Sequence, residues 1–198
     1  QGYMTWFELP TNGGAWAGQG VWGVDDLVSD VTSTVSNSVL TLKVNSIDDP
    51  AEYWYIGGGA PGNPGNKIMD ANLYREFAAG EFAGVTMTFT GTVLANTVSN
   101  SHTVAAFIRD FAPDYSSFNT ATTNLAPGPF SISLTTDPGA GRHVQYGFNF
   151  NGPCVWITDA PAYGNVQLAV DTGFVPAPVD MDLVLDTGPV LSWYAQAG

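Results

Sequence analysis

The sequence predicts an all-β protein, a sandwich of two antiparallel sheets of the jelly-roll type. Apolar and polar residues alternate with period 2 along most of the chain, and helical periodicity is almost absent. Clusters of Gly, Pro and Asp separate the alternating runs. With 198 residues and 44% hydrophobic content, the chain can form one large β domain with a sizeable core. We expect an N-terminal strand and Gly-rich tether over residues 1–20 and a single sandwich domain over residues 21–198.

The expected strands follow from the alternation in chain order. They cover residues 3–9, 38–45, 84–94, 103–111, 130–136, 142–150, 166–170 and 181–185. Along residues 84–94, for example, Met87 and Phe89 point to one face, and Thr86 and Thr88 point to the other. Strands with one apolar and one polar face pack as two sheets with the core between them.

Composition excludes several classes of protein. The chain has 18 acidic and 5 basic residues and a net charge of −13. Five cations cannot cover a phosphate backbone, so we expect no nucleic-acid partner. No run approaches the roughly 20 apolar residues of a membrane helix. The chain starts at Gln1, and we expect a secreted, extracellular protein whose signal peptide has been removed. Cys154 is the single cysteine, which excludes an intrachain disulfide and favours a buried thiol.

The sequence contains no recognisable catalytic motif. Neither a zinc-protease helix motif, a phosphate-binding loop nor a nucleophile elbow is present. We expect His102 and His143 to be solvated polar residues. Glycoside hydrolysis needs two facing carboxyl groups, but with 14 aspartates and 4 glutamates a close pair arises by chance. We therefore expect no enzyme, no catalytic residue and no organic cofactor.

An aspartate-rich run near the C-terminus is a candidate cation site. Asp180, Asp182 and Asp186 share one face of a strand, and three like charges repel unless water or a cation screens them. Carboxylate oxygens of this kind suit calcium. A solvated edge strand, where charges discourage unwanted strand pairing, is the alternative.

The strand at residues 103–111 carries a candidate contact surface. Phe107, Arg109 and Phe111 share one face, opposite a face of aliphatic residues. If the aliphatic face is core, the Phe/Arg face can stack on sugar rings or form a subunit interface, where aromatic residues and Arg are enriched. Alternatively, both faces are buried and Arg109 pairs with an aspartate.

The N-terminal strand is a candidate assembly element. It is apolar on both faces, with Tyr3, Phe7 and Leu9 on one face and Met4 and Trp6 on the other. The Gly-rich residues 11–20 that follow are expected to be flexible. Such a strand can pair with its own sheet or with a neighbour's, and head-to-tail donation produces filaments. The C-terminal segment 190–195 is a second candidate, and an ordinary first strand that closes its own sandwich is the alternative.

The order of these segments resembles that of jelly-roll carbohydrate-binding modules. Phe7 and Glu8 stand in the first strand, the strands at 84–94 and 105–111 follow in sequence, and an Asp-rich strand closes the chain. The resemblance implies a structural calcium shared by Glu8 and either Asp180 or Asp182. Chelation would then lower the melting temperature.

Two functions are compatible with these features. The leading hypothesis is an extracellular structural subunit that assembles head to tail with copies of itself, by strand donation, into a filament or surface layer. The alternative is a non-catalytic, calcium-stabilised carbohydrate-binding module whose partner is a polysaccharide. If residues 3–9 pair within their own subunit, the C-terminal strand becomes the candidate for donation. If no strand is exchanged between subunits, the carbohydrate-binding hypothesis becomes the leading one.

Overall fold

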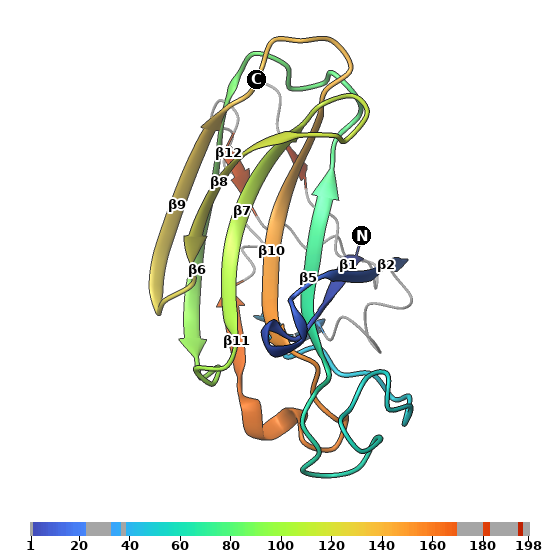
Figure 1. Ribbon diagram of the computed structural model, residues 1–198. Coiled ribbons are helices and arrows are strands. Elements are labelled where there is room, and N and C mark those ends of the chain that lie inside the picture. Colours follow the sequence, from blue (N-terminus) through green and yellow to red (C-terminus); the bar gives the residue numbers. More distant parts are fainter. Residues whose placement is uncertain (1, 23–32, 37–38, 170–179, 183–193, 196–198) are drawn as a thin grey trace.

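The computed structural model confirms the predicted β-sandwich and describes residues 2–22, 33–36, 39–169, 180–182 and 194–195. Two sheets pack face to face (Figure 1). The first sheet has the strand order β2 (Trp16–Trp22), β1 (Gly2–Glu8), β5 (Lys67–Glu76), β10 (His143–Pro153), β7 (Thr103–Phe111) and β8 (Phe118–Asn124). Its pairings are all antiparallel.

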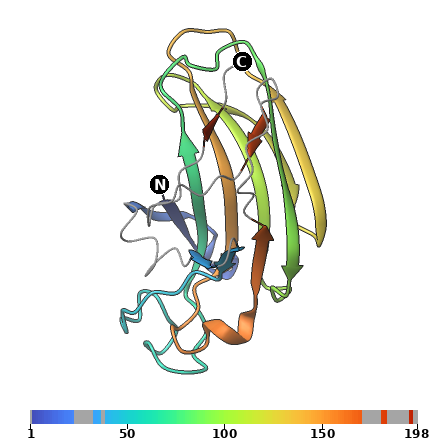
Figure 2. The ribbon, with the colours of Figure 1, turned by 180° about the vertical axis from the view of Figure 1, so that it is seen from behind.

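The second sheet covers the other side of the core, as Figure 2 shows from behind. Its order is β13 (Tyr194–Ala195), β12 (Asp180–Asp182), β6 (Thr86–Asn96), β11 (Asn165–Ala169), β4 (Val39–Lys43) and β3 (Ser33–Ser36), and β9 (Gly128–Thr135) also pairs with β6. The pairing of β12 with β6 is parallel, unlike the antiparallel arrangement predicted throughout. Two short 3-10 turns, η1 (Pro10–Asn12) and η2 (Ala160–Tyr163), lie outside the sheets.

The core lies between the sheets and follows the predicted alternation. Met87 and Phe89 of β6 are fully buried, whereas Thr86 of the same strand is exposed. The Tyr146 ring of β10 stacks on Phe77 and meets Phe89 edge to face across the sandwich. Burial of aromatic side chains of this size supplies a large share of the hydrophobic stabilisation.

A second, smaller cluster lies beneath the loop at residues 45–66. Tyr55 and Cys154 are buried there with Met4 of β1. The Tyr55 hydroxyl donates to the Ile47 carbonyl oxygen at 2.6 Å and accepts from the Cys154 Sγ at 3.2 Å. Burial raises the pKa of the Cys154 thiol, which keeps it protonated and unreactive, as expected for a buried cysteine.

The Gly-rich stretch after β1 is structured, which corrects the prediction of a flexible tether. Residues 10–12 form η1, and residues 16–22 form β2, which pairs with β1 as a hairpin. The packing of Trp6 requires glycine at position 18, because a Cβ there would lie 2.5 Å from Cζ2 of Trp6. Among the described residues, no helix is long and apolar enough to cross a membrane.

Candidate functional site

A groove of about 390 Å³ runs across the outer face of the first sheet. It crosses strands that lie side by side in Figure 1. Its walls combine aromatic rings with amide and charged groups. They are formed by Tyr3, Asn72, Tyr74, Glu76, Arg109, Phe111, Tyr115 and Gln145.

Strand register brings these side chains together. Asn72, Tyr74 and Glu76 alternate along β5 and therefore share one face. Gln145 of β10 stands opposite both Glu76 and Arg109, so one row crosses three strands. These neighbours are distant in sequence and meet only because the strands pair in this register.

Gly147 allows two strands that carry groove residues to lie close to its own strand. It lies between Tyr74 on β5 and Phe107 on β7 in the cross-strand register. A Cβ at this position would lie 2.1 Å from the Leu73 carbonyl oxygen, so the close approach of the two strands requires glycine.

Arg109 lines the groove and lies over the Phe107 ring. Its Cζ stands 4.0 Å from the ring centroid of Phe107, and its Nη1 donates to Asn72 Oδ1 at 3.0 Å. Burial lowers the pKa of Arg109, and the nearby charge of Asp70 partly opposes this shift. A guanidinium stays protonated in proteins, so Arg109 brings a permanent, partly desolvated cation to the groove.

Carboxamides form a polar network beside Arg109. Asn149 Nδ2 donates to Asp70 Oδ1 at 2.7 Å and to Asn72 Oδ1 at 2.9 Å. Asn72 Nδ2 donates to the same Asp70 oxygen at 2.8 Å, and Asn151 Nδ2 donates to Asp70 Oδ2 at 3.4 Å. These mutual bonds hold the amide groups in fixed orientations at one end of the groove.

Tyr115 closes the opposite end. Its ring stacks on His143 at a centroid distance of 4.4 Å, and its hydroxyl donates to Glu76 Oε1 at 2.8 Å. Burial and the neighbouring Glu76 raise the pKa of Tyr115 to about 12, so the hydroxyl remains a donor. Among the described residues, Tyr115 is the only non-glycine with positive φ, at 59°. Such strained residues gather at ligand-binding sites.

The predicted Phe/Arg surface is present on the face expected, with one correction. The aliphatic residues of β7 face the core, and Arg109 and Phe111 line the groove. Phe107 is 0% exposed because Arg109 covers its ring, so it supports the surface from below. The described contacts of Arg109 do not include the aspartate ion pair of the alternative interpretation.

The calcium site predicted at Glu8 and Asp180 or Asp182 stays a prediction. Glu8 Oε2 accepts from the Lys67 ammonium at 3.2 Å, so a cation already neutralises this carboxylate. Glu8 belongs to the first sheet, whereas Asp180 and Asp182 belong to β12 of the second. No group of three or more metal-ligating side chains occurs in the described part of the chain, and Asp186 lies outside it.

The N-terminal strand pairs within the sheet of its own chain. β1 pairs with β2 along one edge and with β5 along the other, so both edges are already hydrogen-bonded. Met4 is fully buried and Trp6 Nε1 donates to the Tyr53 hydroxyl at 2.9 Å. Strand donation through Tyr3, Met4, Trp6, Phe7 and Leu9 would require this hairpin to open, and it stays a prediction. In the C-terminal segment 190–195, the second candidate for strand donation, the described residues 194–195 pair with β12 of the same chain.

Sequence reasoning missed most of the groove. Asn72, Tyr74, Glu76, Tyr115 and Gln145 were not candidates, because their proximity depends on register and on the loop after β7. One signal was present: polar and aromatic residues recur at every second position from 72 to 76, as expected of a binding face on a strand.

Comparison with known proteins gives only distant structural similarity. No known protein family and no curated protein matches the chain. The crystal structure of the enzymatically active domain of tailspike protein 4 from bacteriophage CBA120 is similar, with 15% sequence identity and a TM-score of 0.34. The similarity covers 75% of this chain and 20% of that one. It therefore assigns neither an activity nor a substrate to this protein.

Proposed function

We propose that the protein is a non-catalytic carbohydrate-binding module and that the groove on the first sheet holds the saccharide. The observation that carries this proposal is the composition of the groove walls, which place four aromatic rings beside amide and guanidinium groups. Its volume of about 390 Å³ lies within the range of about 300–1,000 Å³ usual for small-ligand sites.

The chemistry of a sugar ring matches these walls. A pyranose presents apolar C–H faces and a rim of hydroxyl groups. The rings of Phe111 and Tyr115 offer flat surfaces for these C–H faces. The amide of Gln145 and the guanidinium of Arg109 offer donors for the hydroxyl oxygens. The mutual hydrogen bonds of the amide network keep these groups oriented before a ligand arrives, which reduces the entropic cost of binding.

Binding is proposed without hydrolysis. Two carboxyl groups about 5–10 Å apart carry out glycoside hydrolysis. Among the described residues that line the groove, Glu76 is the only carboxylate. Its oxygens already accept from Tyr115 and Gln145, an arrangement that suits a structural acceptor.

Self-assembly by strand donation is less well supported. Both edges of β1 are occupied within the chain, and the strand could be donated only by opening the hairpin and withdrawing Met4 from the core. The carbohydrate-binding hypothesis requires no such rearrangement.

A glycan array followed by calorimetry tests the proposed function. The chain should bind at least one saccharide, and Phe111→Ala should weaken that binding about tenfold, which corresponds to about 1.4 kcal/mol. Trp16→Ala is the matched control, because Trp16 is 61% exposed but does not line the groove. Silence on the array, or equal losses in both variants, would contradict a saccharide site in this groove.

A further inference from the structure

The basic residues of the protein differ in how their charges are compensated. Arg142 Nε donates to Asp110 Oδ1 at 2.8 Å, and Lys67 pairs with Glu8. Arg109 makes no ion pair with a carboxylate in the part of the chain that the structure describes. It is nevertheless the basic residue that lines the groove.

The surroundings of Arg109 remove water, and no described carboxylate lies within ion-pair distance, although the charge of Asp70 acts on the guanidinium from further away. One face of the guanidinium covers Phe107, and its Cζ also lies 5.7 Å from the Phe118 ring centroid. Its described hydrogen bond goes to the neutral amide oxygen of Asn72. A guanidinium has five N–H donors, so this bond leaves capacity for a ligand. A partly desolvated charge without a direct ion pair is costly, and an anion from outside would reduce that cost.

The carboxylates of the same face are already occupied by the protein. Glu76 accepts from Tyr115 and Gln145, and its Oε1 lies 3.6 Å from His143 Nδ1. Asp70 accepts hydrogen bonds from the amides of Asn72, Asn149 and Asn151. Asn72 lies between Asp70 and Arg109, because its Oδ1 accepts from the guanidinium. The oxygens of both carboxylates are thus hydrogen-bonded to donors of the protein, whereas the guanidinium of Arg109 keeps donors for a ligand in the groove.

We propose that the saccharide bound in this groove is acidic and that its carboxylate or sulfate oxygens accept hydrogen bonds from the guanidinium of Arg109. This inference rests on the proposed function and names the class of its ligand. The planar guanidinium matches a carboxylate in a bidentate manner, which a lysine could not reproduce. The aromatic walls hold the sugar ring, and Arg109 selects its charged substituent.

Paired polysaccharides test this inference. Calorimetry compares polygalacturonate with its methyl ester, which has the same backbone without the charge, and a sulfated galactan with its desulfated form. The chain should bind an acidic member at least about tenfold more tightly than its neutral counterpart. Arg109→Met should abolish the preference, and Arg109→Lys should reduce it. Lys43→Met is the control, because Lys43 is an exposed cation of β4 outside the groove.

The possible outcomes separate the two claims. A preference for the carboxylate pair or for the sulfate pair identifies the anionic group. Equal binding of charged and neutral forms, or a preference that survives Arg109→Met, would overturn the acidic ligand while leaving saccharide binding intact. Absence of binding to every saccharide would overturn both. If Arg109→Met does not fold, NMR of the intact chain replaces it. The Nε–H resonance of Arg109 is assigned by its loss in Arg109→Lys. This resonance should shift when the acidic saccharide is added and should not shift with the neutral one.

Discussion

His102 illustrates how a single buried side chain depends on its neighbours. It is 7% exposed, and its Nε2 must donate to the Pro153 carbonyl oxygen at 2.9 Å, since that oxygen can only accept. Its Nδ1 therefore accepts from the Ser101 hydroxyl at 2.9 Å. The expectation of a solvated histidine was wrong for His102, because Gly152 leaves space for its ring. A Cβ at position 152 would lie 2.1 Å from His102 Cδ2.

The burial of His102 predicts a pH dependence of stability. Burial lowers its pKa from the usual value of 6.5, so the unfolded chain binds a proton more readily than the folded chain. The His102 contribution should be fully present above pH 6.5 and should be lost as the pH falls through the lowered folded-state pKa. Each unit of pKa difference corresponds to about 1.4 kcal/mol.

Urea unfolding at pH 7.5 and at pH 5.5 checks this prediction. His102→Asn should show a smaller fall in the free energy of unfolding between these pH values than the unchanged chain. His143→Asn is the control, because His143 is only half-buried. An identical fall in the unchanged chain and in His102→Asn would show that His102 does not titrate as its burial predicts.

Among the elements, the N-terminal hairpin shows where sequence patterns succeed and fail. Period-2 alternation predicted β6, β7 and β10 because each has a clear apolar face. β2 was interpreted as a tether because its glycines suggest flexibility, although Gly18 accommodates the Trp6 ring. β5 was not predicted, because apolar and polar residues occur on both of its faces.

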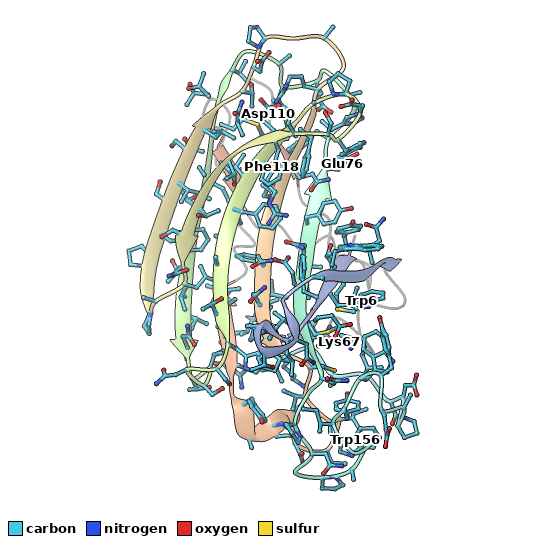
Figure 3. The ribbon with its side chains drawn as sticks, in the orientation of Figure 1. Trp6, Lys67, Glu76, Asp110, Phe118 and Trp156 are labelled. Carbon is cyan, nitrogen blue, oxygen red and sulfur yellow. The ribbon has the colours of Figure 1, made fainter. Side chains whose placement is uncertain are left out.

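A buried cation fastens this hairpin to the rest of the first sheet. Lys67 is 3% exposed, and its Nζ lies 3.2 Å from Glu8 Oε2 and 4.3 Å from the Tyr53 ring centroid. Tyr53 also binds Trp6, so β1, β5 and the loop between β4 and β5 meet at one point. In Figure 3, Lys67 and Glu76 mark opposite ends of β5, so this contact lies away from the Glu76 end of the groove.

This contact predicts which change weakens the hairpin. Glu8→Gln leaves the Lys67 ammonium without its carboxylate and should lower the free energy of unfolding by about 1–3 kcal/mol. Excess calcium chelator should leave the effect of Glu8→Gln unchanged, because Lys67 neutralises Glu8 in the described contact. Thermal melts check both statements. An effect of Glu8→Gln that disappears with chelator, or no effect of this substitution at all, would contradict this role of Lys67.

For the whole molecule, the net charge of −13 opposes the local charge of the groove. An acidic saccharide meets a repulsive field at long range and the Arg109 guanidinium only at contact. The screening length falls from about 30 Å at 0.01 M salt to about 8 Å at 0.15 M. Added salt therefore weakens the long-range repulsion more than it weakens the short-range attraction to Arg109. The association rate with the acidic ligand should therefore rise over this range.

Stopped-flow binding at the two salt concentrations measures this effect. The neutral counterpart of the same saccharide is the control, and its association rate should not depend on salt. A rate that falls with salt for the acidic ligand would indicate attraction at long range, contrary to the charge distribution of this chain.

The fold was more predictable from the sequence than the site, for a physical reason. Alternation along one strand reports which face is buried, and this was sufficient for the sandwich and for the aliphatic face of β7. The groove depends on which residues face each other across strands, as Glu76, Gln145 and Arg109 do. Periodicity contains no information on that register, so Arg109 and Phe111 were found without their partners.

The location of a bound saccharide tests the central claim most directly. Backbone and side-chain NMR signals of the labelled chain are recorded during titration with the saccharide that the array identifies. Residues of the groove, including Tyr74, Arg109 and Gln145, should show the largest shifts, with little change in β6 and β9 of the second sheet. Shifts confined to the second sheet or to the loop at residues 45–66, with the groove signals unchanged, would contradict the assignment of the binding site.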